Sequence, residues 1–236
     1  VVYAIGKGAR IINASYGGTT YSAGAKASIE MARDAGVLFV AAAGNEGNNN
    51  DITHKYPSDY DLSNIISVAS TEADDDISAF SNYGVNSVDL AAPGGSIIST
   101  MPGGSYASMS GTSMATPHVA GVAALVYAQW PWLREQTVKQ LILDSVDEIS
   151  ALNGKVLTEG RLNANSTLRG DEVTWLSGLP ISGVLAPGQA VNIPVAVAAS
   201  ASGNAYLDLY HNAGFDGIGE EISIGRQTIT VSVLPS

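Results

Sequence analysis

Short apolar runs alternate with helix-length segments over the first 170 residues. Residues 36–45, GVLFVAAAGN, are apolar almost throughout, which is typical of a strand covered on both faces. Similar short runs recur along the chain, at residues 9–18, 64–72 and 88–94. Strands that alternate with helices predict an α/β fold, with a mostly parallel sheet and helices on both of its faces.

Helix signals occur in three segments, residues 22–36, 111–129 and 135–146. In the first of these, apolar residues recur on one face, at Ala25, Ile29 and Ala32. Gly36 is expected to end that helix. The chain itself opens on VVYAIGKG, which reads as the tail of a helix stopped by Gly6 or Gly8. We therefore expect a segment that precedes Val1 to be missing.

The pattern changes near residue 170, where alternation with a period of two begins. Apolar residues fall on one strand face at Val191, Ile193, Val195 and Val197, and again at Ile229, Val231 and Val233. The segment LAPGQ, at 185–189, contains Pro and Gly and is predicted to form a turn between strands. The sequence therefore predicts that residues 1–170 form the α/β domain. Residues 171–236 are predicted to form a small all-β, sandwich-like domain, or alternatively a β-rich extension packed on the first.

Composition excludes several classes of function. The formal net charge is -11 and the pI is about 4.5, which argues against nucleic acid or an anionic membrane as a partner. The absence of cysteine removes disulfides, thiolate zinc sites and cysteine catalysis. Charged residues make up 14% of the chain, which favours a secreted, extracellular protein.

A candidate nucleophile lies in GTSMATPHVAG, residues 111–121. Ser113 would sit at a helix N-terminus, where unpaired backbone N–H groups and the helix dipole favour negative charge. A serine there can attack a carbonyl while its own N–H helps to hold the oxyanion. Pro117 is expected within the first helical turn, where a missing N–H costs little. The alternative is that Thr112 or Ser113 is an ordinary N-cap.

The same stretch closely resembles the nucleophile motif of the subtilisin-like serine proteases. Further stretches match that family in the right order: INASYGG (12–18), VAAAGNEGN (40–48), ISAFSNYG (77–84), LAAPG (90–94) and GRLNANSTL (160–168). The resemblance covers about residues 1–168 and implies a subtilisin-like fold whose N-terminal part is missing.

The resemblance assigns roles to individual residues. It puts Asn45 in the place of the side-chain donor to the oxyanion, a task that suits an uncharged amide. Its alternative role is that of a turn residue beside Gly44. Substrate would be bound by two segments, Ser15, Tyr16 and Gly17, and Ala42, Ala43 and Gly44. The family usually has leucine at the position of Tyr16, so the shape of that subsite differs.

The general base is the element that this sequence lacks. The family's triad runs Asp, His, Ser along the chain, but neither the aspartate motif nor His-Gly-Thr occurs here. His118 follows Ser113 by about 500° of helical turn and matches the family's buried packing histidine. His54 reads as a solvated loop residue, and His211 lies in the β region. The His/Asp pair is therefore expected from outside this chain.

The missing strands should leave a sheet edge open. We expect the edge at residues 9–14 or 36–42 to be covered by the missing N-terminal segment or by a second chain.

No cofactor is required for the chemistry. KYPSDYD (55–61) resembles a family loop that holds a structural calcium or monovalent cation, with Ser58 and Tyr60 as candidate ligands; the alternative is a solvated acidic loop. FDGIGEE (215–221) offers further oxygen ligands without EF-hand spacing.

These observations predict a serine endopeptidase that hydrolyses peptide bonds in peptide or protein substrates. Ser113 would be its nucleophile and Asn45 part of its oxyanion hole, and the chain alone would be inactive. The alternative is a catalytically inactive, protease-like binding or scaffolding module.

Overall fold

The computed structural model describes residues 1–169 in full, and the backbone of residues 176–177, 196–197, 203–211 and 222–231. The chain divides into two compact units, Val1–Glu172 and Val173–Ser236. The first contains every residue that the sequence assigns to the nucleophile, the oxyanion donor and the substrate segments.

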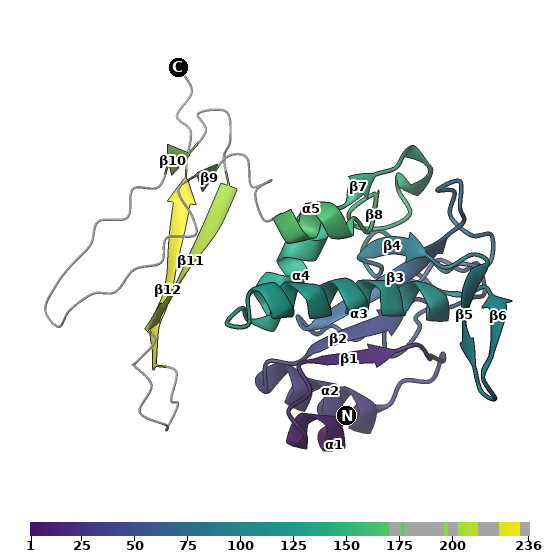
Figure 1. Cartoon of the computed structure of the whole chain (residues 1–236), viewed down its shortest axis with the longest axis horizontal. Coiled ribbons are helices and arrows are strands. Elements are labelled where there is room, and N and C mark those ends of the chain that lie inside the picture. Colours follow the sequence, from purple (N-terminus) through teal and green to yellow (C-terminus); the bar gives the residue numbers. More distant parts are fainter. Residues whose placement is uncertain (170–175, 178–195, 198–202, 212–221, 232–236) are drawn as a thin grey trace, which may run out of the picture. The chain divides into compact units, whose positions relative to one another are not determined.

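A six-stranded sheet forms the centre of the first unit (Figure 1). Its strands lie in the order β1 (Ile11–Ala14), β2 (Leu38–Ala42), β3 (Ile65–Thr71), β4 (Leu90–Pro93), β8 (Gly160–Arg161) and β7 (Asp147–Glu148). All neighbours pair in parallel except β7 and β8, which confirms the predicted mostly parallel α/β fold. Within the described part of the chain β1 has a partner on one side only. The expectation that residues 36–42 could form an open edge is wrong, since β2 lies between β1 and β3.

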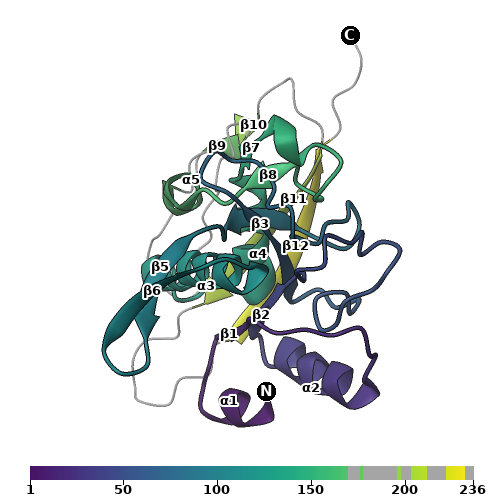
Figure 2. The same ribbon diagram turned by 90° about the vertical axis from the view of Figure 1, so that its right-hand side faces the viewer.

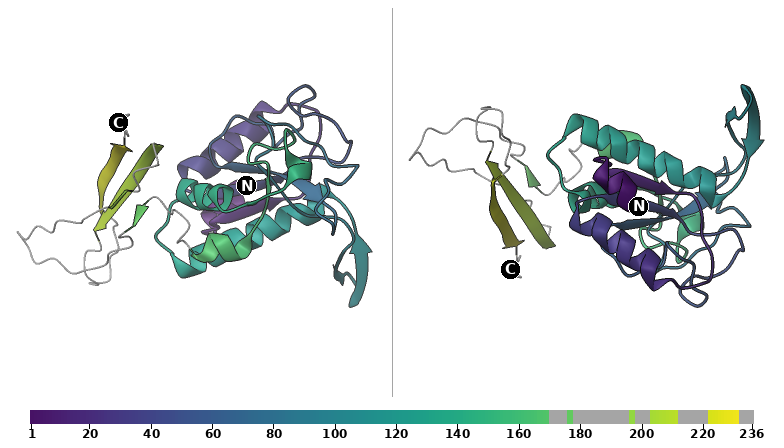
Figure 3. Two further views of the ribbon diagram at one scale, coloured as in Figure 1. Left: turned by 90° about the horizontal axis from the view of Figure 1, so that it is seen from above. Right: turned by 90° about the horizontal axis from the view of Figure 1, so that it is seen from below.

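Helices cover both faces of the sheet (Figure 3). One face carries α1 (Val2–Gly6) and α2 (Ala23–Asp34), and the other carries α3 (Thr112–Gln129), α4 (Glu135–Asp144) and α5 (Ala164–Arg169). Ser22 caps α2 through a hydrogen bond from Ala25 N–H, and Gly36, at φ +70°, follows its end as predicted. Of the three apolar residues that recur on one face of α2, Ile29 and Ala32 are buried, whereas Ala25, in the first turn, is exposed.

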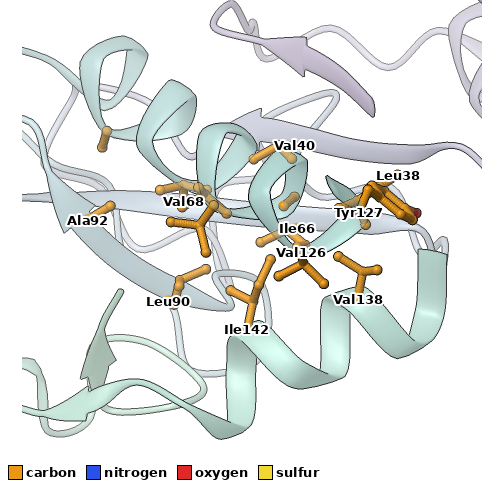
Figure 4. Packing of buried hydrophobic residues seen from close by; sticks show 14 residues of the cluster. Leu38, Val40, Ile66, Val68, Leu90, Ala92, Val126, Tyr127, Val138 and Ile142 are labelled. Carbon is orange, nitrogen blue, oxygen red and sulfur yellow. The ribbon is translucent and has the colours of Figure 1, made fainter. Parts of the chain in front are cut away.

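The core follows from the alternation of side chains along buried strands. In β2, Leu38 and Val40 point to the α3 face, whereas Phe39 and Ala41 pack with Ile29 of α2. All five residues of β2 are buried, as its unbroken apolar run predicts. Figure 4 shows the larger cluster filling the space between the sheet, α3 and α4.

Replacing Leu38 with alanine is expected to lower the free energy of unfolding by about 3 kcal/mol, because the side chain is fully buried and its removal leaves a cavity. Leu125→Ala is the matched control, since Leu125 lies on α3 with 51% of its surface exposed; its expected effect is within about 0.5 kcal/mol. Urea denaturation followed by circular dichroism measures both. Equal losses for the two variants would contradict this core assignment.

A hairpin that the sequence analysis did not predict precedes α3. Its strands are β5 (Ile97–Met101) and β6 (Ser105–Met109), which pair antiparallel around a turn that uses positive φ at Gly103 and Gly104. The hairpin projects from the end of the sheet where α3 begins (Figures 1 and 2). The turn sequence Pro-Gly-Gly at 102–104 was the available signal, but the flanking strands, IISTM and SYASM, lack a regular apolar alternation.

In the second unit the described strands all pair antiparallel. β9 (Leu176–Ser177) pairs with β10 (Ala196–Val197), and β11 (Gly203–His211) pairs with β12 (Ile222–Val231). Val197, Ile229 and Val231 therefore lie in strands, as predicted. Val191, Ile193, Val195, Val233 and the turn at 185–189 lie outside the described residues, and the sandwich stays a prediction.

Candidate active site

The candidate site lies where two parallel strands end and α3 begins. Ser15 directly follows β1, and Gly44 and Asn45 follow β2. The start of α3 is tied to the end of β4 by a hydrogen bond from Gly111 N–H to Gly94 O, 2.9 Å. The carboxyl ends of parallel strands are the usual place for a site in an open α/β sheet. The fold thus brings together residues that are about 100 positions apart in the sequence.

Ser113 is the second residue of α3 and is half-buried. Its hydroxyl donates to Ser15 O at 3.0 Å, and the hydroxyl of Ser15 donates to Ser113 O at 2.9 Å. The expectation for Pro117 was wrong, because α3 begins at Thr112 and Pro117 lies in its second turn. A proline has no N–H to donate to the carbonyl four residues earlier. It therefore leaves Ser113 O available to Ser15, and this reciprocal pair fixes Ser113 against the end of β1.

Ser15→Ala is expected to lower the free energy of unfolding by about 1 kcal/mol, because it leaves the part-buried carbonyl of Ser113 without its donor. Ser105→Ala, in the exposed strand β6, is the matched control and is expected to change nothing measurable. Chemical denaturation of the two variants side by side tests this. A neutral Ser15→Ala would mean that the reciprocal pair does not stabilise the site.

The side chain of Asn45 is oriented by Thr112, the residue before Ser113. Its Oδ1 accepts from Thr112 N–H at 2.8 Å and from the Thr112 hydroxyl at 3.0 Å. Both lone pairs of the amide oxygen are thereby used, which fixes which end of the amide is nitrogen. Within residues 1–169, Nδ2 has no hydrogen-bond partner. The arrangement leaves an uncharged N–H₂ donor free at the start of α3.

The two predicted substrate segments differ in what they offer. Tyr16 is 61% exposed and Gly17 is also exposed, while Gly18 forms a bridge with Tyr56 that anchors the segment. Ala42, Ala43 and Gly44 are buried. The backbone of the last two is engaged internally: Ala43 N–H donates to Val68 O, and Gly44 N–H donates to the Thr112 hydroxyl at 3.3 Å. The structure thus places residues 15–17 as the open segment and residues 42–44 as a buried wall.

The histidines do not meet Ser113 in the described residues. His118 lies on the exposed face of α3, and its Nδ1 is 2.9 Å from Met114 O, so the expectation of a buried packing residue is wrong. It follows Pro117 on the side of the helix turned away from the sheet core. His54 has a side chain that is 58% exposed, as expected for a loop, and lies 3.5 Å from Asp59. The structure describes only the backbone of His211, in β11.

The side chains of the predicted cation loop are hydrogen-bonded within the loop and to neighbouring segments. Ser58 and Tyr60 are buried. The Ser58 hydroxyl donates to Lys55 O, and the Tyr60 hydroxyl donates to Ser22 O at 2.9 Å. Asp59 accepts from Lys55 N–H, and burial raises the pKa of its carboxyl. Among the residues that the structure describes, no group of three or more His, Asp or Glu side chains is placed to hold a metal ion. Residues 215–221 lie outside the described residues.

Glu46 and Lys55 form a polar network next to Asn45 that the sequence did not predict. Glu46 accepts from Asn45 N–H at 3.1 Å and forms an ion pair with Lys55. The hydrogen bond from Lys55 holds the pKa of the Glu46 carboxyl below its usual value. Lys55 in turn packs against Gly17, where an added Cβ would lie 3.5 Å from Lys55 Cε. The pair thereby links the loop of Asn45 to the exposed segment at Gly17.

Within the described part of the chain, no helix is both long and apolar enough to cross a membrane.

Comparison with known proteins gives one consistent result. The subtilase family (peptidase S8) matches residues 1–170. Thermitase from Thermoactinomyces vulgaris is 45% identical over 164 residues, which is 70% of this chain and 56% of thermitase. Subtilisin NAT from Bacillus subtilis subsp. natto is 41% identical over 143 residues, 60% of this chain and 37% of that protein. The chain thus spans about half, or less, of the length of these curated relatives.

Solved structures give the same picture. The prenylagaramide maturation protease PagA superposes with a TM-score of 0.63 at 27% identity, over 72% of this chain and 64% of the other. A protease from Pseudoalteromonas arctica superposes with a TM-score of 0.61 at 30% identity, over 68% of this chain and 50% of the other.

Proposed function

Because the chain belongs to the subtilase family, we propose that it carries the nucleophile and the oxyanion donor of a serine endopeptidase. The observation that carries the proposal is the orientation of Asn45. Its amide oxygen accepts two hydrogen bonds from Thr112, the residue directly before Ser113. The amide nitrogen of Asn45 is therefore left as a donor at the start of α3. An ordinary N-cap needs only a side-chain oxygen that accepts from the helix, and it would not require an amide donor from a separate loop.

The chemistry assigns one step to each group. Ser113 Oγ attacks the carbonyl carbon of the peptide, and its proton passes to a histidine that lies outside this chain and is paired with an aspartate. The oxyanion is held by Asn45 Nδ2–H and by the N–H of Ser113, a donor that the first turn of α3 leaves without a helical acceptor. Collapse of the intermediate breaks the C–N bond, and the leaving amine takes the proton. Water then attacks the acyl-enzyme and releases the acid product and Ser113.

We assign the substrate to a peptide in extended conformation that lies along residues 15–17. Strand addition needs free backbone groups at an exposed edge. Tyr16 and Gly17 are exposed, whereas the backbone of residues 42–44 is largely engaged within the fold. On this proposal residues 42–44 serve as a wall for a substrate side chain. The low share of charged residues, 14%, supports action outside the cell.

The open side of β1 is the proposed place for the polypeptide that supplies the base. An unpaired strand edge offers N–H and C=O groups to a neighbour, and β1 has a partner strand on one side only in the described part of the chain. Its end is also where Ser15 contacts Ser113. A strand added there would end beside the nucleophile.

We expect the purified 236-residue chain to show no peptidase turnover above its Ser113→Ala variant. Co-production with sequence encoded upstream in the same gene is expected to restore hydrolysis of a fluorogenic peptide, and the two polypeptides should co-purify. Turnover by the chain alone, lost on Ser113→Ala, would place a base within these residues and contradict the proposal. Upstream sequence that lacks both triad motifs would favour a non-catalytic binding module instead.

A further inference from the structure

A buried asparagine lies behind the loop that carries Asn45. Asn82 is 1% exposed, and its segment runs alongside residues 44–50. Four backbone hydrogen bonds join the two segments: Gly47 N–H donates to Phe80 O, Asn82 N–H to Gly44 O, Tyr83 N–H to Asn48 O, and Asn50 N–H to Tyr83 O. The loop of the oxyanion donor is thus held from one side by residues 80–83.

The Asn82 side chain uses its full hydrogen-bonding capacity on this loop. Its Oδ1 accepts from the N–H groups of Glu46 at 2.9 Å and Asn48 at 3.1 Å. Its Nδ2 donates to Glu46 Oε2 and to Asn50 Oδ1, both at 3.0 Å. An asparagine amide has two donors and two acceptor lone pairs, and all four are satisfied. Flipping the amide would set N–H₂ against two N–H groups, so only one orientation fits.

Asn82 fixes the residues on both sides of Asn45. Its own N–H donates to Gly44 O at 2.9 Å, and its amide occupies the space that a Cβ on residue 44 would need. Gly44, at φ +115°, tolerates that approach because it has no side chain. On the other side Asn82 holds both the N–H and the carboxylate of Glu46, and that carboxylate accepts from Asn45 N–H.

We propose that Asn82 is a positioning residue that acts through Asn45. Asn45 is itself exposed, and among residues 1–169 its side chain is held only at the oxygen, by Thr112. Where its nitrogen points therefore depends on the backbone of residues 44–46, which Asn82 fixes. A displacement of about 1 Å at a reacting centre costs roughly 10²-fold in rate. The proposal rests on the proposed function, in which Asn45 donates to the oxyanion.

The first test needs no activity. In the full chain, Asn82→Asp keeps the shape but replaces two donors with a charge beside Glu46. We expect hydrogen exchange at the N–H groups of Asn45, Glu46 and Asn48 to quicken by about ten-fold or more. Asn64→Asp is the matched control, because Asn64 is fully buried and donates to Val37 O at 3.0 Å, away from this loop. Unchanged exchange in Asn82→Asp, or equal changes in both variants, would overturn the proposal.

Asn82→Ser serves the same test should the aspartate variant fail to fold. It removes the amide without adding charge, and the same local quickening is expected. Because exchange is measured without turnover, its outcome is independent of whether the chain is a peptidase. A failure of the proposed function, with no hydrolysis in any preparation, is therefore distinguishable from a failure of this proposal.

The second test is a double-mutant cycle in the co-produced, hydrolysing preparation. Asn82→Asp is expected to lower kcat about ten-fold and to change KM less than two-fold. This loss in kcat is smaller than the roughly 10²-fold cost of a full 1 Å displacement. In an Asn45→Ala background the same substitution should change kcat less than two-fold, because its route of action is gone. A ten-fold loss that persists without the Asn45 amide would show that Asn82 acts elsewhere.

Discussion

Ser113→Ala is expected to lower kcat by about 10⁶-fold in the preparation that hydrolyses peptides, which is the magnitude of the equivalent loss in subtilisin. The physical reason is that no other group in the site replaces the attacking oxygen. The hydroxyl of Ser15, which contacts Ser113, donates to the carbonyl of Ser113 and accepts from the Asn13 amide. The remaining rate would come from binding and the oxyanion hole alone.

The control for this experiment is Ser105→Ala, in the exposed β6 strand, which is expected to leave kcat within two-fold. Circular dichroism should show both variants folded, since the Ser113 side chain is only half-buried. A Ser113→Ala variant that retains a tenth or more of the turnover would remove this serine from the chemistry.

Asn45→Ala is expected to lower kcat by about 10²–10³-fold, the range observed when subtilisin loses its corresponding donor. KM should change less than about three-fold, because the interaction forms with the oxyanion and not with the planar ground-state carbonyl. The loss of a neutral donor also predicts no shift in the pH profile of kcat. Steady-state kinetics over a range of pH measures all three quantities.

Asn48→Ala provides the matched control, because Asn48 belongs to the same loop and has an exposed side chain. Its expected effect on kcat is less than two-fold. Equal effects at positions 45 and 48 would mean that Asn45 contributes only to loop structure, and a rise in KM alone would assign it to ground-state binding.

Local patterns were sufficient to predict most of the sheet and its helices. The apolar run in β2 predicts a strand buried on both faces, and the end of α2 follows from Gly36. The hairpin β5–β6 was missed because its large side chains, such as those of Ile98 and Tyr106, are exposed and follow no regular apolar alternation along the strands. Pro117 was placed a turn too early because the start of α3 was not fixed by the pattern alone.

In the candidate site, too, some residues could be predicted from the sequence and others could not. Ser113 and Asn45 stand in distinctive motifs and could be selected from sequence. The contacts of Asn82 with Glu46 and Asn50 join residues more than 30 positions apart, and neither period nor spacing encodes them. The exposure of His118 likewise depends on which face of α3 meets the sheet. Such pairings become visible only when distant segments are brought together.

The central claim is that Ser113 is the nucleophile, and a fluorophosphonate probe tests it most directly. Such probes phosphonylate an activated serine, with loss of fluoride, and leave a stable adduct. We predict a single adduct on the co-produced preparation, mapped by peptide mass spectrometry to Ser113, absent in Ser113→Ala and much slower to form in Asn45→Ala. An adduct at another residue, or a preparation that hydrolyses peptides while Ser113 stays unlabelled, would contradict the account.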